Sequence, residues 1–153
     1  SIDVNSNKIT YKKYFHIGFA VDTPHGLMVP KIRNVDQMSI QKIGEELKKT
    51  SKLCRELKID KKEFFGGSIT ISSLGGIGGT HFTPIINPPE VAILGVGKNF
   101  DRLVKENGKI VSRKILPVSL SYDHRIIDGA EGARFCVYLG KCLGKDFAFK
   151  LAV

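Results

Sequence analysis

The amino-acid sequence predicts an α/β fold, a two-layer sandwich built on a mixed β-sheet. Strand patterns outnumber helical ones, because β-branched and apolar runs recur between turn signals. A tight hairpin signal occurs alongside longer connections, so antiparallel and parallel strand pairs are expected together. The 153 residues, 42% of them hydrophobic, are enough for one core, and no repeat or linker divides the chain.

The first half of the chain is expected to supply three strands of this sheet. Residues 14–21 predict a mostly buried strand, and residues 27–32 predict a second one after a turn over 22–26. Residues 68–74 are rich in β-branched side chains and predict a third strand. The glycine-rich segment 75–79 should form the loop after it.

One helix is predicted between the second and third strands. Ser39 is a suitable N-cap, and the helix should run to about Leu57. Its apolar positions recur on one face: Ile40, Ile43, Leu47, Cys54 and Leu57. Asp60, followed three residues later by Glu63, suggests a short capped turn after the helix. Basic and acidic side chains alternate over 41–63, which is typical of a solvent-exposed helix face.

The second half predicts two strands, a hairpin and a final helix. Residues 91–96 and 115–122 have the pattern of strands, and Asn107-Gly108 lies between apolar pairs as a strong hairpin signal. The final helix should run over residues 129–143. Its inward-facing residues are expected to be Ala133, Phe135, Val137, Leu139 and Cys142.

Composition and charge exclude several functional classes. A net charge of +9 would suit an acidic partner, but no aromatic-basic pattern accompanies it, so nucleic-acid binding is not expected. No apolar run is long enough for a membrane helix, and no secretory leader is recognisable. Three cysteines without a Cys-x-x-Cys pair fit a reducing compartment, and four scattered histidines predict no metal site.

The glycine-rich loop at 75–79 does not match a nucleotide-binding motif. His81 stands where Gly-x-Gly-x-x-Gly requires a glycine, and no Lys-Ser/Thr pair follows. A tight backbone path, where side chains would obstruct a neighbouring group, explains the glycines better. Gly-x-Ser-x-Gly is absent, so a hydrolase nucleophile elbow has no support.

The sharpest local signal is the segment from Asp123 to Gly129, Asp-His-Arg-Ile-Ile-Asp-Gly. A predicted buried strand delivers His124 into a turn, and imidazole is the best general base at neutral pH. Asp128 follows four residues later and could order the turn or hold a cationic partner. The alternative on spacing alone is that His124 is an ordinary surface or capping residue.

The sequence around His124 resembles a known family. Residues 119–130, Ser-Leu-Ser-Tyr-Asp-His-Arg-Ile-Ile-Asp-Gly-Ala, closely resemble the active-site segment of the dihydrolipoamide acyltransferases, the core subunits of 2-oxo acid dehydrogenase complexes. Further blocks at 16–30, 67–75 and 84–96 match in the same order. The segment 72–84 is most similar to the acetyl-transferring members of pyruvate dehydrogenase complexes. Succinyl-transferring members usually carry Asn-Gly-Gly where this chain has Ser-Leu-Gly.

This resemblance implies a fold, an activity and an assembly. The fold should be similar to that of chloramphenicol acetyltransferase. The expected activity of a dihydrolipoyllysine-residue acetyltransferase is transfer of an acetyl group between dihydrolipoamide and coenzyme A, at the core of a pyruvate dehydrogenase complex linked to glycolysis. Homotrimers should assemble into a larger shell that also binds the decarboxylase and dihydrolipoamide dehydrogenase subunits. Alternatives are a succinyl- or branched-chain acyltransferase of a sister complex, or a catalytically silent structural core subunit.

The resemblance also assigns roles to three residues. His124 is implied to be the general base that takes the thiol proton, and Ser72 the donor to the oxyanion of the tetrahedral intermediate. The two should meet across a subunit boundary. Asp128 is implied to be structural and ion-paired to an arginine that positions the histidine loop. No residue is assigned to bind coenzyme A, and the lipoyl group is expected on a domain outside this chain.

Three further expectations follow from the family. Residues 1–153 should be the C-terminal part of the acyltransferase catalytic domain, without its N-terminal part and without the lipoyl and subunit-binding domains. The location should be the bacterial cytoplasm, with the mitochondrial matrix as the alternative. The apolar C-terminal residues Leu151–Val153 should dock on a neighbouring trimer.

Overall fold

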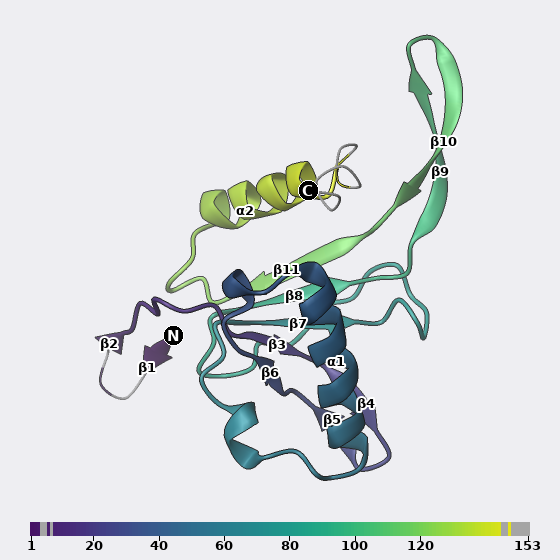
Figure 1. The fold of residues 1–153 in the computed structure, drawn as a ribbon. Helices are drawn as coiled ribbons and strands as arrows, with labels where there is room; N and C mark the ends of the chain where they lie inside the picture. Colours follow the sequence, from purple (N-terminus) through teal and green to yellow (C-terminus); the bar gives the residue numbers. More distant parts are fainter. Residues whose placement is uncertain (4–5, 7, 145–146, 148–153) are drawn as a thin grey trace.

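A five-stranded mixed sheet forms the centre of the molecule. The computed structural model describes residues 1–3, 6, 8–144 and 147. The strands run in the order β11-β8-β7-β3-β6. Their bounds are β3 Ile17–Phe19, β6 Lys31–Ile32, β7 Ile69–Ser73, β8 Ala92–Val96 and β11 Val118–Tyr122. β7 pairs in parallel with β3 and β8, whereas the pairs β3–β6 and β8–β11 are antiparallel (Figure 1). The predicted mixed sheet is confirmed.

Two helices lie on one face of this sheet, here called the helix face. They are α1, Ile40–Arg55, and α2, Gly129–Cys142. Ile71 of β7 lines a cavity with Leu47 of α1, and Leu120 of β11 lines another with Phe135 of α2. Both Ile71 and Leu120 pair with Leu94, so their side chains share one face. The apolar side of the sheet is therefore the side that the helices cover.

The opposite side, here called the loop face, is more polar. Its residues in register are Gly18, Lys31, Thr70, Ser72, Ile93, Gly95, Ser119 and Ser121. The chain leaves β7 at one end and must return to the other to start the parallel strand β8. Part of this crossing lies over Gly95, because a Cβ atom there would be 2.9 Å from the Phe82 ring and 3.2 Å from Pro84. The segment 80–90 thus serves as the second layer on this side.

The predicted start of α1 is confirmed. Ser39 caps it, since its hydroxyl accepts a hydrogen bond from the Lys42 backbone N–H at 3.2 Å. Cys54 faces inward and is fully buried. Lys42 pairs with Glu46 one turn away on the outer side. Asp60 caps the short helix η2, Lys61–Phe64, as predicted.

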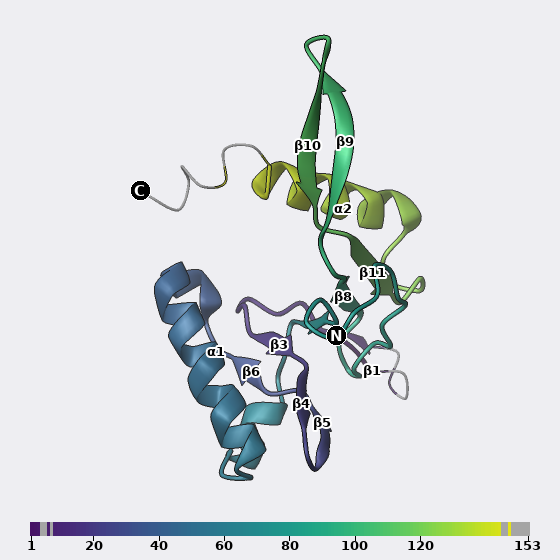
Figure 2. The ribbon, with the colours of Figure 1, turned by 90° about the vertical axis from the view of Figure 1, so that its right-hand side faces the viewer.

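The predicted hairpin is formed by β9, Phe100–Glu106, and β10, Lys109–Ile115. Asn107 and Gly108 have φ of 50° and 79°, the left-handed values of a tight two-residue turn. This hairpin pairs with no other strand of the described chain and projects from the body (Figure 2). It connects the end of β8 to β11.

Several strands are shorter than the sequence predicts. The strand expected over 14–21 is divided into β3 and β4, Val21–Thr23, and β4 pairs with β5, Gly26–Met28, in a small hairpin. The strand expected over 27–32 is interrupted at buried Pro30, which has no N–H to donate to a ladder. Residues 115–122 are divided likewise, at Leu116-Pro117.

The remaining short elements lie near the N-terminus. The strands β1, Ile2–Asp3, and β2, Lys8–Ile9, pair with each other, and the short helix η1, Val35–Gln37, precedes α1. In the part of the chain that the structure describes, no helix has the length and apolar character needed to span a bilayer. The expected docking segment Leu151–Val153 lies outside the described residues.

The prediction of inward residues on α2 is wrong for Ala133 and Val137, which are exposed. Phe135 is partly exposed but faces the sheet across the cavity that it lines, and Leu139 and Cys142 are half-buried. The helix lies close to the edge strand β11, where it has few neighbours. Gly132 is its one buried residue among those described, because a Cβ there would lie 2.8 Å from the Tyr122 ring. Part of the apolar side of α2 is thus not covered by the described residues of this chain.

Candidate functional site

Ser72 lies near the end of β7 and points to the loop face. It is half-buried and pairs with Gly95 of β8. Its neighbour Ser73 points to the helix face, where it lines a cavity beside α1. Among the described residues, the Ser72 hydroxyl has no hydrogen-bond partner. It is therefore available to a bound substrate.

Phe82 covers the strand next to Ser72. Its ring and Pro84 occupy the space that a side chain at position 95 would need. The backbone of Thr80 approaches Gly97 still more closely, since a Cβ there would lie 2.2 Å from the Thr80 carbonyl oxygen, and the Lys98 N–H donates to the Gly79 carbonyl oxygen at 2.8 Å. The glycines therefore let a covering segment approach the sheet beside Ser72.

Phe82 is a site residue that the sequence patterns above do not predict. The signal that could have revealed it is a glycine inside a buried strand, which often marks a close approach of another segment. Gly95 is such a residue, and it is the direct neighbour of Ser72 in the sheet.

His124 lies in the turn after β11 and is exposed. Its ring is tilted by 40° against that of Tyr122, with 5.7 Å between centroids. The preceding residue, Asp123, forms an ion pair with Arg125 at 2.6 Å and accepts the Arg125 backbone N–H at 3.0 Å. The Arg125 guanidinium and this N–H lower the pKa of Asp123 to about 2. The turn that presents His124 is thus held by its two neighbours.

Asp128 ends this turn and starts α2. Its carboxylate accepts a hydrogen bond from the Glu131 backbone N–H at 2.7 Å, as an N-cap does. Among the described residues it forms no ion pair, and the acid that pairs with an arginine in this turn is Asp123. Asp128 fixes the direction in which α2 leaves the turn.

The structure does not bring Ser72 and His124 together within one chain. β11 runs antiparallel to β8, so its last residues lie at the edge of the sheet where β7 and β8 begin. Ser119 is in line with Ser72 across β8, and Tyr122 lies three residues further along. These spacings put the Cα atoms of Ser72 and Tyr122 about 14 Å apart, and His124 lies beyond Tyr122.

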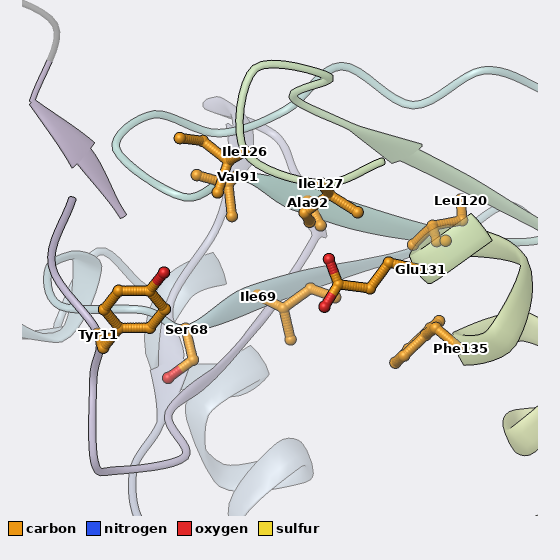
Figure 3. A pocket seen from close by; sticks show the side chains of 11 residues that line it. Tyr11, Ser68, Ile69, Val91, Ala92, Leu120, Ile126, Ile127, Glu131 and Phe135 are labelled. Carbon is orange, nitrogen blue, oxygen red and sulfur yellow. The ribbon is translucent and has the colours of Figure 1, made fainter. Parts of the chain in front are cut away.

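A cavity of about 400 Å³ lies elsewhere, between α2 and the helix face of the sheet. Ile69, Leu120 and Phe135 contribute apolar side chains, and the Glu131 carboxylate also points into it (Figure 3). None of the three predicted site residues lines it. Since Ser72 points to the other face, this cavity is not part of a Ser72 site.

The described residues offer neither a metal site nor a disulfide. In the described ranges, no group of three or more His, Cys, Asp or Glu side chains is arranged to hold a metal ion. Cys54, Cys136 and Cys142 are free thiols, and burial raises the pKa of Cys54.

Comparison with known proteins identifies the family. Residues 1–148 match the family described as 2-oxoacid dehydrogenases acyltransferase (catalytic domain). The chain belongs to this family. Its sequence is 49% identical over 144 residues to the dihydrolipoyllysine-residue acetyltransferase component of the pyruvate dehydrogenase complex of Cupriavidus necator. It is 52% identical over 143 residues to the corresponding component of Haemophilus influenzae.

Solved acyltransferase structures share the fold. One comes from crystallographic and enzymatic work on a serine, a histidine and an asparagine in the catalytic mechanism of Azotobacter vinelandii dihydrolipoamide acetyltransferase, with a TM-score of 0.90 and 51% identity. Another is the cubic core of a pyruvate dehydrogenase multienzyme complex, with a TM-score of 0.90 and 50% identity. The expected chloramphenicol acetyltransferase-like α/β fold is therefore confirmed.

The chain spans only part of these relatives. The match covers 94% of this chain but 26% and 25% of the Cupriavidus and Haemophilus proteins. It covers 97% of this chain and 61% of the Azotobacter chain.

Proposed function

We propose that this chain belongs to an acetyltransferase that moves an acetyl group between dihydrolipoamide and coenzyme A. The observation that carries the proposal is the spacing of three residues. The serine and histidine studied in the Azotobacter enzyme are separated by as many residues as Ser72 and His124, and its asparagine follows the histidine as Asp128 does here. The same acid-base and oxyanion groups would then stand on the same fold.

The chemistry follows from the two side chains. A thiol has an ordinary pKa of about 8.5, so little thiolate exists at neutral pH, and a neutral imidazole at His124 would remove the proton as attack begins. The thiolate adds to the carbonyl carbon of the thioester, and the carbonyl oxygen becomes an anion. The Ser72 hydroxyl would donate to that oxyanion. Collapse of the intermediate expels the second thiolate, which takes the proton back from His124.

We infer that each site forms between two subunits. Ser72 and His124 lie too far apart in one chain to act on the same thioester, which supports a histidine supplied by a neighbouring copy. Ser72 has an unpartnered hydroxyl, and His124 is exposed. Both groups are therefore accessible to the adjacent subunit.

The surface area also supports an assembly. The chain has a solvent-accessible surface of 10923 Å² for 16.9 kDa. A compact monomer of that mass is expected to expose about 7,700 Å². Neighbouring subunits of a trimeric core would cover part of the excess, including the exposed apolar residues of α2.

We assign Asp128 a positioning role in this reaction. The Azotobacter protein has asparagine at the matching place, and asparagine caps a helix as well as aspartate does. An N-cap requires no charge, so the Asp128–Glu131 hydrogen bond accounts for both residue types. An ion pair between Asp128 and an arginine outside the described residues stays a prediction.

Acetyl is favoured over larger acyl groups by Phe82. The ring lies over Gly95, directly beside Ser72 on the loop face, and would limit the space next to the oxyanion. A succinyl or branched-chain group would need that space. The presence of both Ser72 and His124 argues against a catalytically silent core subunit.

The wider assembly is proposed on the names of the relatives. They are components of pyruvate dehydrogenase complexes, and one solved relative forms a cubic core. We propose that this protein forms such a core and meets the decarboxylase and dihydrolipoamide dehydrogenase subunits there. Assignment to the C-terminal part of the catalytic domain and a bacterial cytoplasmic location stay predictions.

The test is native mass combined with acetyl transfer on one sample of the full-length protein. Multiples of a trimer, with transfer from acetyl-coenzyme A to dihydrolipoamide, are expected. An assembly that forms but transfers no acetyl, succinyl or branched-chain group would instead identify a structural core subunit.

A further inference from the structure

A buried ion pair lies on the loop face near Ser72. The Lys31 ammonium donates to Glu90 at 2.6 Å, and the side chains of the two residues are 1% and 2% exposed. The Thr70 hydroxyl donates to the second carboxylate oxygen of Glu90 at 2.6 Å. The Lys31 ammonium is also 3.4 Å from the Thr70 hydroxyl oxygen. We call Lys31, Thr70 and Glu90 the buried triad.

The fold reserves space for these three side chains. A Cβ on Gly18 would lie 2.5 Å from the Thr70 hydroxyl oxygen and 2.6 Å from the Lys31 ammonium nitrogen. A Cβ on Gly67 would collide with the Glu90 carboxylate. Gly18 lies between Lys31 and Thr70 in the sheet, so the missing side chain lets the two meet across β3.

Stability alone is a poor explanation for such a cluster. Removing two charges from water is costly, and well-packed apolar side chains often replace a buried ion pair without loss. The triad is fully hydrogen-bonded, since no buried side-chain polar atom in the described ranges lacks a partner. Buried networks of this kind hold side chains and backbone in one arrangement.

The triad holds one end of the segment 80–90, which covers the sheet beside Ser72. Glu90 lies just before β8, and Phe82 and Pro84 contact the sheet at Gly95. The segment 80–90 is therefore held at both ends, by its contacts with Gly95 and by the hydrogen bond between Glu90 and Thr70. Thr70 and Ser72 are two residues apart on the same strand and the same face. A shift of β7, or of the segment 80–90 at Glu90, would therefore change the surroundings of the Ser72 hydroxyl.

We propose that Lys31, Thr70 and Glu90 are positioning residues for acetyl transfer, which fix the segment 80–90 beside Ser72. The inference rests on the proposed function of Ser72. A shift of about 1 Å in a reacting group can cost about 100-fold in rate. The triad should thus affect kcat more than the KM for coenzyme A.

The experiment is a double-mutant cycle on the full-length assembly. Glu90→Gln keeps the size of the side chain and removes its charge. We expect it to lower kcat at least 10-fold in the protein with Ser72 and less than 2-fold in the Ser72→Ala background, because a mispositioned hydroxyl matters only when it is present. Glu63→Gln is the matched control, since Glu63 pairs with Arg33 on the half-exposed surface, and it should leave kcat unchanged.

Thr70→Ser and Thr70→Val provide a second route if Glu90→Gln does not assemble. The serine variant keeps the hydroxyl and should keep the kcat of the unmodified protein. The valine variant lacks the hydroxyl and should have a lower kcat. Equal loss of kcat in both Ser72 backgrounds, or lower thermal stability with unchanged kcat per site, would overturn the positioning role. If the unmodified assembly transfers no acetyl group, or Ser72→Ala does not affect transfer, the proposed function itself has failed.

Discussion

Replacing Ser72 by alanine tests the proposed mechanism most directly. The hydroxyl has no partner in the described chain, so its loss should change the free energy of unfolding by about 1 kcal/mol or less. The loss of transition-state stabilisation should be much larger than this. An oxyanion donor typically contributes about 2.7–4 kcal/mol, so kcat should fall about 10²–10³-fold with a smaller change in KM.

Ser73→Ala is the matched control, because alternation along β7 turns that hydroxyl to the helix face beside α1. Acetyl transfer from acetyl-coenzyme A to dihydrolipoamide should be measured for both variants at equal native mass. Ser73→Ala should retain the kcat of the unmodified protein. A large loss in Ser73→Ala with none in Ser72→Ala would refute the assignment of the two faces.

Three other outcomes are expected. His124→Ala should lower kcat about 10²–10⁴-fold without changing the native mass, and near-normal transfer would exclude His124 as the base. Arg125→Met should flatten the acid dependence of the unfolding midpoint. Arg125 lowers the folded-state pKa of Asp123 from 3.8 to about 2, so the pair stabilises the fold above pH 3.8 and this stabilisation disappears as the pH falls to about 2. A variant with an unchanged acid profile would contradict that role. Phe82→Ala should raise kcat/KM for longer acyl thioesters relative to acetyl by about 10-fold or more, and an unchanged ratio would show that the ring does not limit acyl size.

Local chemistry made much of the fold predictable. Ser39 and Asp60 cap the elements they were expected to cap, and Asn107-Gly108 makes the expected turn, because each signal acts within a few residues. The prediction of one strand over 14–21 was wrong at its C-terminal end. The pattern of apolar residues indicates a buried run, but it does not show which strand each part of the run will pair with. β3 pairs with β7, in a register that joins residues 52 positions apart such as Ile17 and Ile69, and β4 pairs with its own neighbour β5.

The candidate site could be predicted from the sequence only in part. Ser72 and His124 were identified by resemblance, and nothing in their spacing shows that they lie toward opposite ends of the strands. The Lys31–Glu90 pair joins residues 59 positions apart, and a lysine in a strand predicts exposure rather than burial. The exposed side of α2 was mispredicted because an apolar face in the sequence does not reveal which chain covers it.

The separation of Ser72 from His124 has a genetic consequence. On the proposed mechanism, a subunit lacking the serine and a subunit lacking the histidine would each be inactive alone, yet they would be defective at opposite sides of the interface. If each site takes its serine from one subunit and its histidine from the next, random mixing of the two in equal amounts restores about a quarter of the sites. Two null alleles of one gene would then complement each other in a single cell.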